Sequence, residues 1–188
     1  MPFCFTDHMR DLMADIAATC GELRHIDLGR VAVAFAQARH SQLHGTYAVI
    51  HPSRFPSGSR QMLRRGHLYE LPRLVAGGVE MLYVIEFRLP RFQNLPFVQK
   101  LTTIVHEMYH ISPSFDGTLR RFEGGKPYHT GSRHNYDAAM AAIASRYLAA
   151  TARPELHAWL RLDFPQLAEA NGGVVGLRFR HLSPRRIG

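Results

Sequence analysis

Apolar side chains recur every three or four residues in several stretches of the chain, and this spacing predicts helices. The first helix runs from Thr6, which we expect to cap it, to about Cys20. The clearest helix follows a cap expected at Asn94 or a neighbour, carries one apolar stripe at positions 101, 104, 105, 108 and 111, and cannot continue past Pro113.

Two further helices are expected in the C-terminal half of the chain. An alanine-rich segment over 134–150 carries one apolar stripe, and Pro154 opens a shorter helix that contains Trp159. The pair Gly172-Gly173 then interrupts the chain before an apolar run at 174–179, which we interpret as a late strand.

Three earlier apolar runs predict strands, at 31–35, 47–51 and 79–89. The last of these runs is apolar on both alternating faces, a pattern typical of a strand that is covered on both sides. Between the second and third strands, residues 53–67 mix turn formers with four arginines and predict an exposed basic loop.

The composition favours a single folded domain. The chain has 188 residues, 46% apolar and 20% charged, so it can bury a core, and disorder, collagen and coiled coil are excluded. We expect one α+β domain over residues 1–180 and a basic C-terminal tail at 181–188. Cys4 and Cys20 match no metal or redox spacing and are expected to be free thiols. The chain shows no export signal or membrane span, which predicts a cytoplasmic protein.

The charge balance favours anionic partners. Lys and Arg number 23 against 15 acidic residues, which gives a net charge of +8, and Lys occurs only at Lys100 and Lys126. Arginine side chains make most phosphate contacts, so DNA is a candidate partner through the arginine-rich segments. The arginines of these segments are Arg54, Arg60, Arg64, Arg65, Arg120, Arg121, Arg178, Arg180, Arg185 and Arg186.

Residues 106–110 read His-Glu-x-x-His and lie within the clearest predicted helix. Successive residues of a helix are about 100° apart, so His106 and His110 share one face, one turn apart, where two imidazoles can bind one ion. Glu107 lies beside them, and the apolar stripe lies on the opposite side, so the histidines are expected to face a cleft or solvent. Chance gives roughly 0.03 such matches in a chain of this composition, so the motif indicates a zinc site.

A catalytic zinc takes three protein ligands and leaves a fourth position to water, so a third ligand must come from outside the helix. His129 is our first choice, because it lies in a glycine-containing loop that can fold back over the metal face. Asp116 has a second interpretation, as part of an Asp-Gly turn. The alternatives to His129 that stay open are His134, Asp137, Asp116 and Glu123.

The residues around this motif resemble a known family. The run Lys-Leu-Thr-Thr-Ile-Val-His-Glu-Met-Tyr-His-Ile at 100–111, followed by Phe115-Asp116-Gly117, Leu119-Arg120-Arg121 and Tyr136-Asp137, is similar to the phage-type metallopeptidases of bacteria and their phages. The resemblance covers roughly residues 80–148. More distantly, the arrangement is similar to the SprT-like zinc peptidases, in which a third histidine follows in a downstream loop.

The resemblance carries expectations for both site and fold. It implies zinc as the cofactor, His106 and His110 as its ligands and Glu107 as the catalytic carboxylate, and His129 matches the third ligand of the SprT-like enzymes loosely. It also implies a zincin-like domain, in which a small mixed sheet packs against the helix that carries the motif.

We therefore hypothesise zinc-dependent hydrolysis of a peptide bond in a protein or peptide substrate. Glu107 would accept a proton from a zinc-bound water, the resulting hydroxide would attack the peptide carbonyl, and Glu107 would pass the proton to the leaving nitrogen. Tyr109, Tyr128 and Tyr136 lie near this site, where we expect them to pack, with oxyanion stabilisation as the alternative. The alternative function is a basic, nucleic-acid-associated protein with a structural or degenerate metal site.

Overall fold

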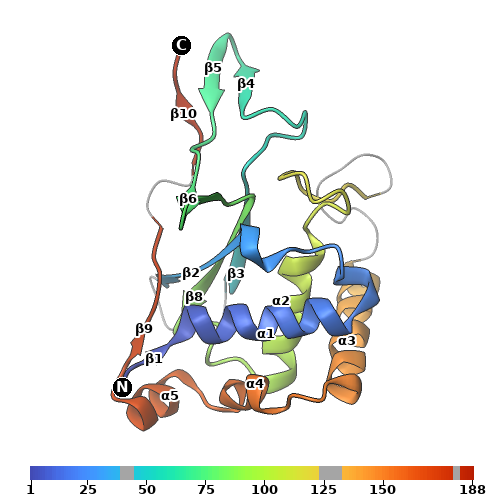
Figure 1. The fold of residues 1–188 in the computed structure, drawn as a ribbon, viewed down its shortest axis with the longest axis vertical. Coiled ribbons are helices and arrows are strands. Elements are labelled where there is room, and N and C mark those ends of the chain that lie inside the picture. Colours follow the sequence, from blue (N-terminus) through green and yellow to red (C-terminus); the bar gives the residue numbers. More distant parts are fainter. Residues whose placement is uncertain (39–44, 123–132, 180–182) are drawn as a thin grey trace.

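The chain has a mixed α/β fold in the computed structural model, which describes residues 1–38, 45–122, 133–179 and 183–188 (Figure 1). Within these ranges the α-helices are α1 (Phe5–Thr19), α2 (Phe97–Tyr109), α3 (Arg133–Ala150), α4 (Glu155–Ala158) and α5 (Phe164–Asn171). The short 3-10 helices are η1 (Gly21–Leu23), η2 (Leu28–Arg30) and η3 (Trp159–Arg161). The mixed α/β class agrees with the α+β expectation at this level.

The strands form four small sheets among the described residues. Their order is β2-β8-β3, β10-β5-β4, β6-β7 and β1-β9. The strands are β1 (Phe3–Cys4), β2 (Val31–Gln37), β3 (Ala48–Pro52), β4 (Gln61–Arg64), β5 (His67–Glu70), β6 (Val75–Ala76), β7 (Val79–Glu80), β8 (Tyr83–Leu89), β9 (Val174–Val175) and β10 (Arg185–Arg186).

The central sheet is mixed, because β8 pairs in parallel with β2 and antiparallel with β3. One face of β8 joins the main apolar core, and its other face packs with two alanines of β2 and with Leu74 and Phe179. The expectation of a strand covered on both sides is therefore confirmed for β8. The expected strand was too long, since Val79–Glu80 pairs in a separate hairpin with β6.

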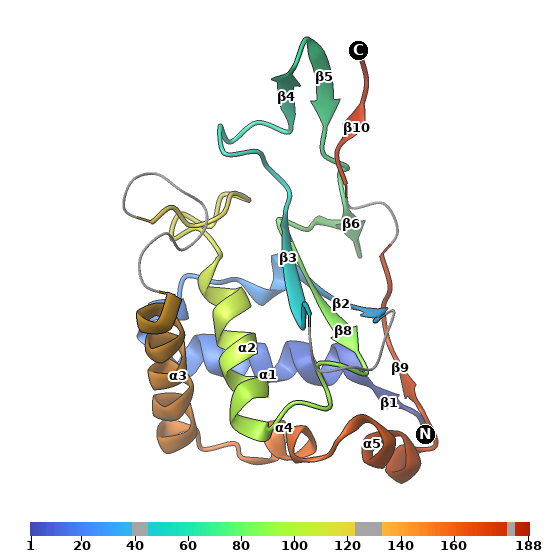
Figure 2. The same cartoon turned by 180° about the vertical axis from the view of Figure 1, so that it is seen from behind.

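Helices α1 and α2 cover the core face of the central sheet. Both helices contribute their apolar stripes to one core cluster with β2, β8 and α3. Viewed from behind, α2 lies beside β3 on one side and α3 on the other, with α1 crossing beyond it (Figure 2). This packing places the outer face of α2 next to the edge of the sheet.

Two of the expected helix caps are wrong. Helix α1 begins at Phe5, and Thr6 is buried in its first turn, where its hydroxyl accepts a hydrogen bond from the N–H of Leu177 at 3.2 Å. Helix α2 begins after Pro96, and the Asn94 side chain accepts instead from the N–H of Phe164 at 2.9 Å. In both cases a polar side chain bonds a distant segment, which local spacing cannot reveal.

The C-terminal region differs from the expectation in two ways. The sequence pattern missed α5, which has a capping box between Asp163 and Gln166 and ends at Gly172. The late strand is only Val174–Val175, which pairs in parallel with β1. The short helix at Pro154 is confirmed, and Trp159 begins the 3-10 turn that follows it.

The expected basic loop at 53–67 is wrong for its second half. Gln61–Arg64 and His67–Glu70 form an antiparallel hairpin, β4–β5, and β10 adds a third strand to it. Arg65 and Gly66 close the hairpin with φ angles of 50° and 77°, as a two-residue type I′ turn requires. The paired backbone makes this segment a sheet although the side chains of β4 are mostly exposed and those of β5 are only half-buried.

Two further expectations concern the cysteines and the membrane. Cys4 and Cys20 are free thiols, as expected. Across the described ranges, the chain contains no helix with the length and apolar character needed to span a bilayer.

The Tyr83 hydroxyl fixes the loop that follows α2. It donates to the carbonyl of Thr118 at 2.8 Å and accepts from the N–H of Gly117 at 3.0 Å, in a fully buried position.

We expect Tyr83→Phe to lower the free energy of unfolding by about 1–3 kcal/mol, because two buried backbone groups lose their partner. Urea denaturation measures this change, with Tyr69→Phe on the exposed hairpin as the control, expected within about 0.5 kcal/mol of the native protein. Equal effects of the two substitutions would contradict this role.

Candidate metal centre

Helix α2 presents two different faces. Its apolar stripe of Leu101, Ile104, Val105 and Met108 is fully buried in the core. This burial fixes the rotation of the helix about its axis, because each of these side chains contributes about 1.5–3 kcal/mol when it leaves water. The predicted stripe is confirmed, and the histidines lie on the other face.

The two motif histidines face each other across one turn. The Nε2 atoms of His106 and His110 are 3.1 Å apart, and the two rings meet at 70° with centroids 4.8 Å apart. Tyr109 is the last helical residue, and His110 still has helical angles, φ −68° and ψ −16°. The motif therefore occupies the end of α2, where backbone geometry still keeps both imidazoles on one face.

The separation of the two nitrogens fits one shared ion. Zinc binds imidazole nitrogen at about 2.0–2.1 Å with tetrahedral angles, which places two ligand nitrogens about 3.3 Å apart. The observed 3.1 Å lies within a few tenths of an ångström of that value. The pair can therefore either share a hydrogen bond or hold a metal ion without rearrangement of the helix.

Glu107 lies beside the pair and is almost completely buried, with 8% of its surface exposed. Burial raises the pKa of this carboxyl group to about 7, and a hydrogen bond with the backbone of Ile50 in β3 acts in the opposite direction. Glu107 is thus able to exchange a proton near neutral pH.

Aromatic rings surround the histidines. Tyr136 of α3 meets the His106 ring edge-on at 5.1 Å and stacks on the His110 ring at 6.2 Å and 30°. Phe122 contacts the His110 ring and the Tyr136 ring at 6.3 and 5.6 Å. Burial raises the pKa of Tyr136, so its hydroxyl stays protonated at neutral pH. The expected packing role of Tyr136 agrees with these contacts, and the hydroxyl of Tyr128 lies outside the described residues.

Arg120 closes the C-terminal end of α2. Its Nε donates to the carbonyl of Tyr109 at 2.6 Å and its backbone N–H donates to the carbonyl of His110 at 2.7 Å. The guanidinium also lies over the Tyr109 ring, 4.0 Å from its centroid. A cation at this position donates to carbonyls that the helix end leaves without partners. Its positive charge also interacts favourably with the negative end of the helix dipole. Sequence reasoning assigned Arg120 to phosphate binding and missed this contact, since the partner carbonyls belong to the motif itself.

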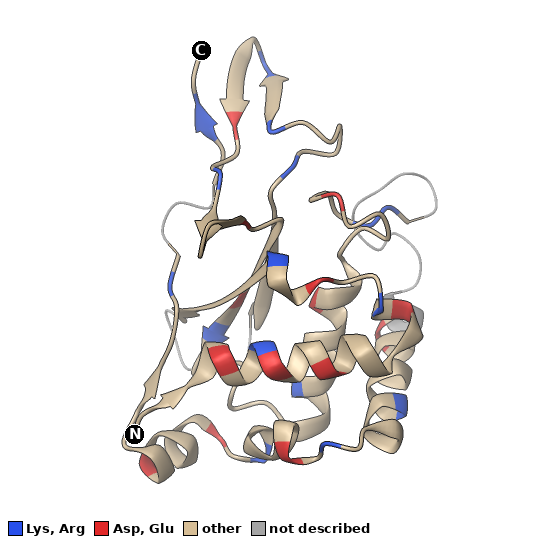
Figure 3. Ribbon diagram, viewed as in Figure 1, with Lys and Arg blue, Asp and Glu red and all other residues tan. Residues whose placement is uncertain are grey.

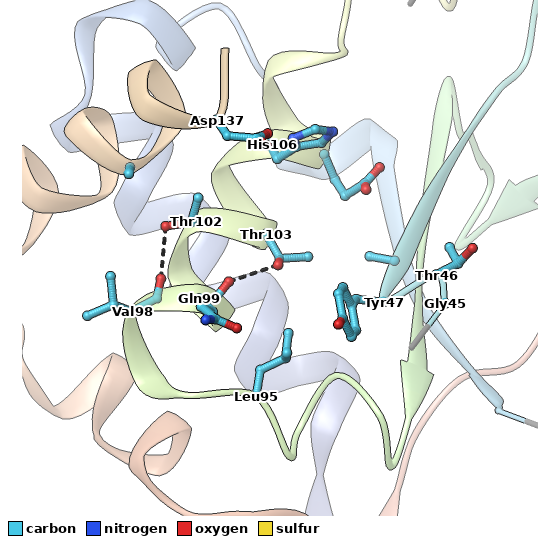
Figure 4. A pocket seen from close by; sticks show the side chains of 13 residues that line it. Gly45, Thr46, Tyr47, Leu95, Val98, Gln99, Thr102, Thr103, His106 and Asp137 are labelled. Carbon is cyan, nitrogen blue, oxygen red and sulfur yellow. Dashed lines mark hydrogen bonds between the residues drawn. The ribbon is translucent and has the colours of Figure 1, made fainter. Parts of the chain in front are cut away.

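His106 and Glu107 open onto a cleft of about 790 Å³. Tyr47 and Ala48 at the start of β3 form one wall, and the exposed face of α2 forms the other (Figure 4). Thr102 and Thr103 on this face donate their hydroxyls to the helix carbonyls of Val98 and Gln99 (Figure 4). The expectation that the histidines face a cleft holds for His106, whereas His110 lies deeper, at 7% exposure.

No protein family model, curated protein or solved structure matches this chain.

The third-ligand candidates have different positions. Asp137 of α3 lines the cleft, and its side chain extends towards His106 (Figure 4). Asp116 accepts from both the N–H and the hydroxyl of Thr118, at 3.0 and 2.7 Å, in the turn that the Asp-Gly pair predicts. Where side chains are described, no three His, Cys, Asp or Glu residues come together as a metal-binding group.

The remaining candidates cannot be placed. His129, the first choice, and Glu123 lie outside the described residues. His134 belongs to the first turn of α3, where only the backbone is described. The ligand set His106, His110 and His129 therefore stays a prediction.

The metal-free protein is expected to lose stability as the pH rises from 5 to 8. Glu107 has a raised pKa when folded, so the folded state binds a proton that the unfolded state releases above its ordinary pKa of 4.5. The stabilisation is present at low pH and is lost as the pH passes about 7. The difference in unfolding free energy between the native protein and Glu107→Gln should change by about 2–3 kcal/mol over this range.

Denaturant unfolding in the presence of a chelator, at several pH values, measures this difference. Glu155→Gln removes a largely exposed carboxyl group on α4 and serves as the control, with no pH-dependent difference expected. If the difference in unfolding free energy between the native protein and Glu107→Gln did not change with pH over this range, the burial of this carboxylate would be contradicted.

Proposed function

We propose that this protein hydrolyses peptide bonds with a zinc ion held by His106 and His110, with Glu107 as the proton acceptor. The observation that carries the proposal is the pair of facing Nε2 atoms, 3.1 Å apart, beside a cleft that His106 and Glu107 line. Zinc bound by this pair would polarise a carbonyl group and lower the pKa of water towards neutrality. The resemblance to the phage-type metallopeptidases supports this activity and, within the mixed α/β fold, a zincin-like arrangement.

Glu107 performs the proton transfers of the reaction. Its carboxylate takes a proton from the attacking water in the cleft and delivers that proton to the amine nitrogen that leaves the cleaved bond. Burial raises the pKa of this carboxyl group in the metal-free protein, which favours proton uptake during the reaction, and a bound cation would favour the release of that proton. The Ile50 backbone contact and the surrounding apolar residues hold the carboxylate in place.

The cleft suits an extended peptide. Its volume of about 790 Å³ is sufficient for several residues, and it runs between α2 and β3. Strand β3 is one of the two outer strands of the central sheet as far as the chain is described, so its backbone can pair with an extended chain.

The test combines metal content with proteolysis. Purified protein should contain about one zinc per chain, and His106→Ala and His110→Ala should lose it. Glu107→Gln should keep the zinc and lower the rate of cleavage of β-casein or a quenched fluorescent peptide library by at least about 100-fold. Elemental analysis and initial rates measure the two properties, with His67→Ala on the exposed hairpin as the control for both.

Two results would overturn the proposal. One is cleavage by Glu107→Gln at the native rate, which would remove the proton-transfer role. The other is the retention of stoichiometric zinc in the double variant His106→Ala/His110→Ala, which would place the metal elsewhere.

A further inference from the structure

The positive charge of the chain is concentrated in one projecting part. We define the arm as residues 53–80 and 183–188, which contain β4, β5, β6, β7 and β10. Strands β4, β5 and β10 extend away from the helical body (Figure 1). The arm holds seven arginines and two glutamates, a net charge of +5 out of the +8 of the whole chain. Its basic segments are visible along the hairpin and β10 (Figure 3).

Several of the arginines expected to bind phosphate are engaged within the protein. Arg54 pairs with Glu80 at 3.0 Å, and Arg60 lies 3.7 Å from Glu70. Arg120 caps α2, and Arg178 lies over the Phe35 ring. These contacts reduce the set of arginines that can serve a partner.

Four arginines of the arm are exposed and make no ion pair with any residue in the described ranges: Arg64, Arg65, Arg185 and Arg186. Arg185 pairs in register with Glu70 and so lies on the opposite face of the sheet from Arg186. The strand register places Arg186 opposite Tyr69 and Met62, and Arg64 opposite His67. Cross-strand partners share a face and side chains alternate along a strand, so Arg64 and Arg186 lie on the same face of the sheet. We call Arg64, Arg65 and Arg186 the basic face.

Arg65 occupies a backbone conformation that its side chain disfavours. Its φ of 50° is left-handed, and the first position of a type I′ turn normally carries Asn, Asp or Gly. The sequence therefore keeps a cation at the tip of the hairpin where an uncharged residue would fold more easily. Strain retained at an exposed position is typical of a functional contact.

We propose that the basic face binds the phosphate backbone of double-stranded DNA without sequence preference. Arg64 and Arg186 are two residues apart along the strands and two strands apart across the sheet, a backbone separation of about 12 Å. The major groove of B-DNA is about 12 Å wide and admits a narrow β-structure, so the two guanidinium groups can reach phosphates on its opposite sides. Arg65 at the tip adds a third phosphate contact.

The composition of the basic face favours a duplex over other nucleic acids. Single strands are held by successive aromatic rings, and in the described arm Tyr69 is the only Phe, Tyr or Trp on this face. The deep, narrow major groove of double-stranded RNA does not admit such a structure. The binding surface does not include His106, Glu107 or His110, so the inference stands independently of the proposed peptidase activity.

Fluorescence anisotropy with a labelled 20-base-pair DNA duplex of mixed sequence, between 50 and 200 mM KCl, tests the inference. Three phosphate contacts predict a slope of about −3 for the logarithm of the binding constant against the logarithm of salt concentration. Arg64→Ala/Arg186→Ala should bring this slope to about −1 and weaken binding at least about tenfold at 100 mM salt. The matched control is Arg10→Ala/Arg24→Ala, which removes the same charge from exposed positions of the body and should keep the native slope.

Arg65→Asn separates binding from folding. This substitution relieves the left-handed strain, so it should raise the melting temperature while it lowers the magnitude of the salt slope by about 1. Glu107→Gln should bind the duplex as tightly as the native protein.

Three outcomes would overturn the inference. The first is no duplex binding at 50 mM salt. The second is an equal loss of duplex affinity in the control variant Arg10→Ala/Arg24→Ala, which would mean that binding depends on the total charge of the chain and not on the basic face. The third is binding to vesicles of phosphatidylserine and phosphatidylcholine, or to single-stranded DNA, in preference to the duplex.

Discussion

The rotational setting of α2 is the constraint on which the site depends. Its apolar stripe is fully buried against the core. Turning the helix would expose these side chains to water and cost several kcal/mol of folding free energy. Because the stripe can face only inward, His106 and Glu107 must face the cleft, and His110 follows one turn later. The chemistry of the site is thus a consequence of hydrophobic packing on the opposite side of the same helix.

The end of this helix is held by contacts from later parts of the chain. Arg120 satisfies the carbonyls of Tyr109 and His110, and Tyr83 of β8 anchors the loop between the helix and Arg120. Tyr136 arrives from α3 and packs on both imidazoles. The pair of histidines is therefore fixed by the sheet, the loop and α3 together, and the two rings need little ordering before they can bind an ion.

The sequence predicted those features of the fold that depend on the local spacing of apolar residues. The stripe of α2 and the two-sided burial of β8 follow from spacing alone, and both are confirmed. The caps at Thr6 and Asn94 were wrong because their hydrogen bonds reach across the fold. The hairpin at 61–70 was missed because backbone pairing stabilises it and exposed side chains carry no periodic signal. The choice of His129 depends on a tertiary approach that spacing does not encode, and it stays a prediction.

X-ray absorption spectroscopy of the zinc-loaded protein tests the central claim most directly, because it reads the ligand atoms without the need for a substrate. At least two imidazole nitrogens at about 2.0–2.1 Å, and three if His129 is the third ligand, are expected in the native protein together with an oxygen at an open position. The imidazole signal should fall when His110 is replaced by alanine. A closed shell of four protein side chains, or an imidazole signal unchanged after both histidines of α2 are removed, would contradict the account.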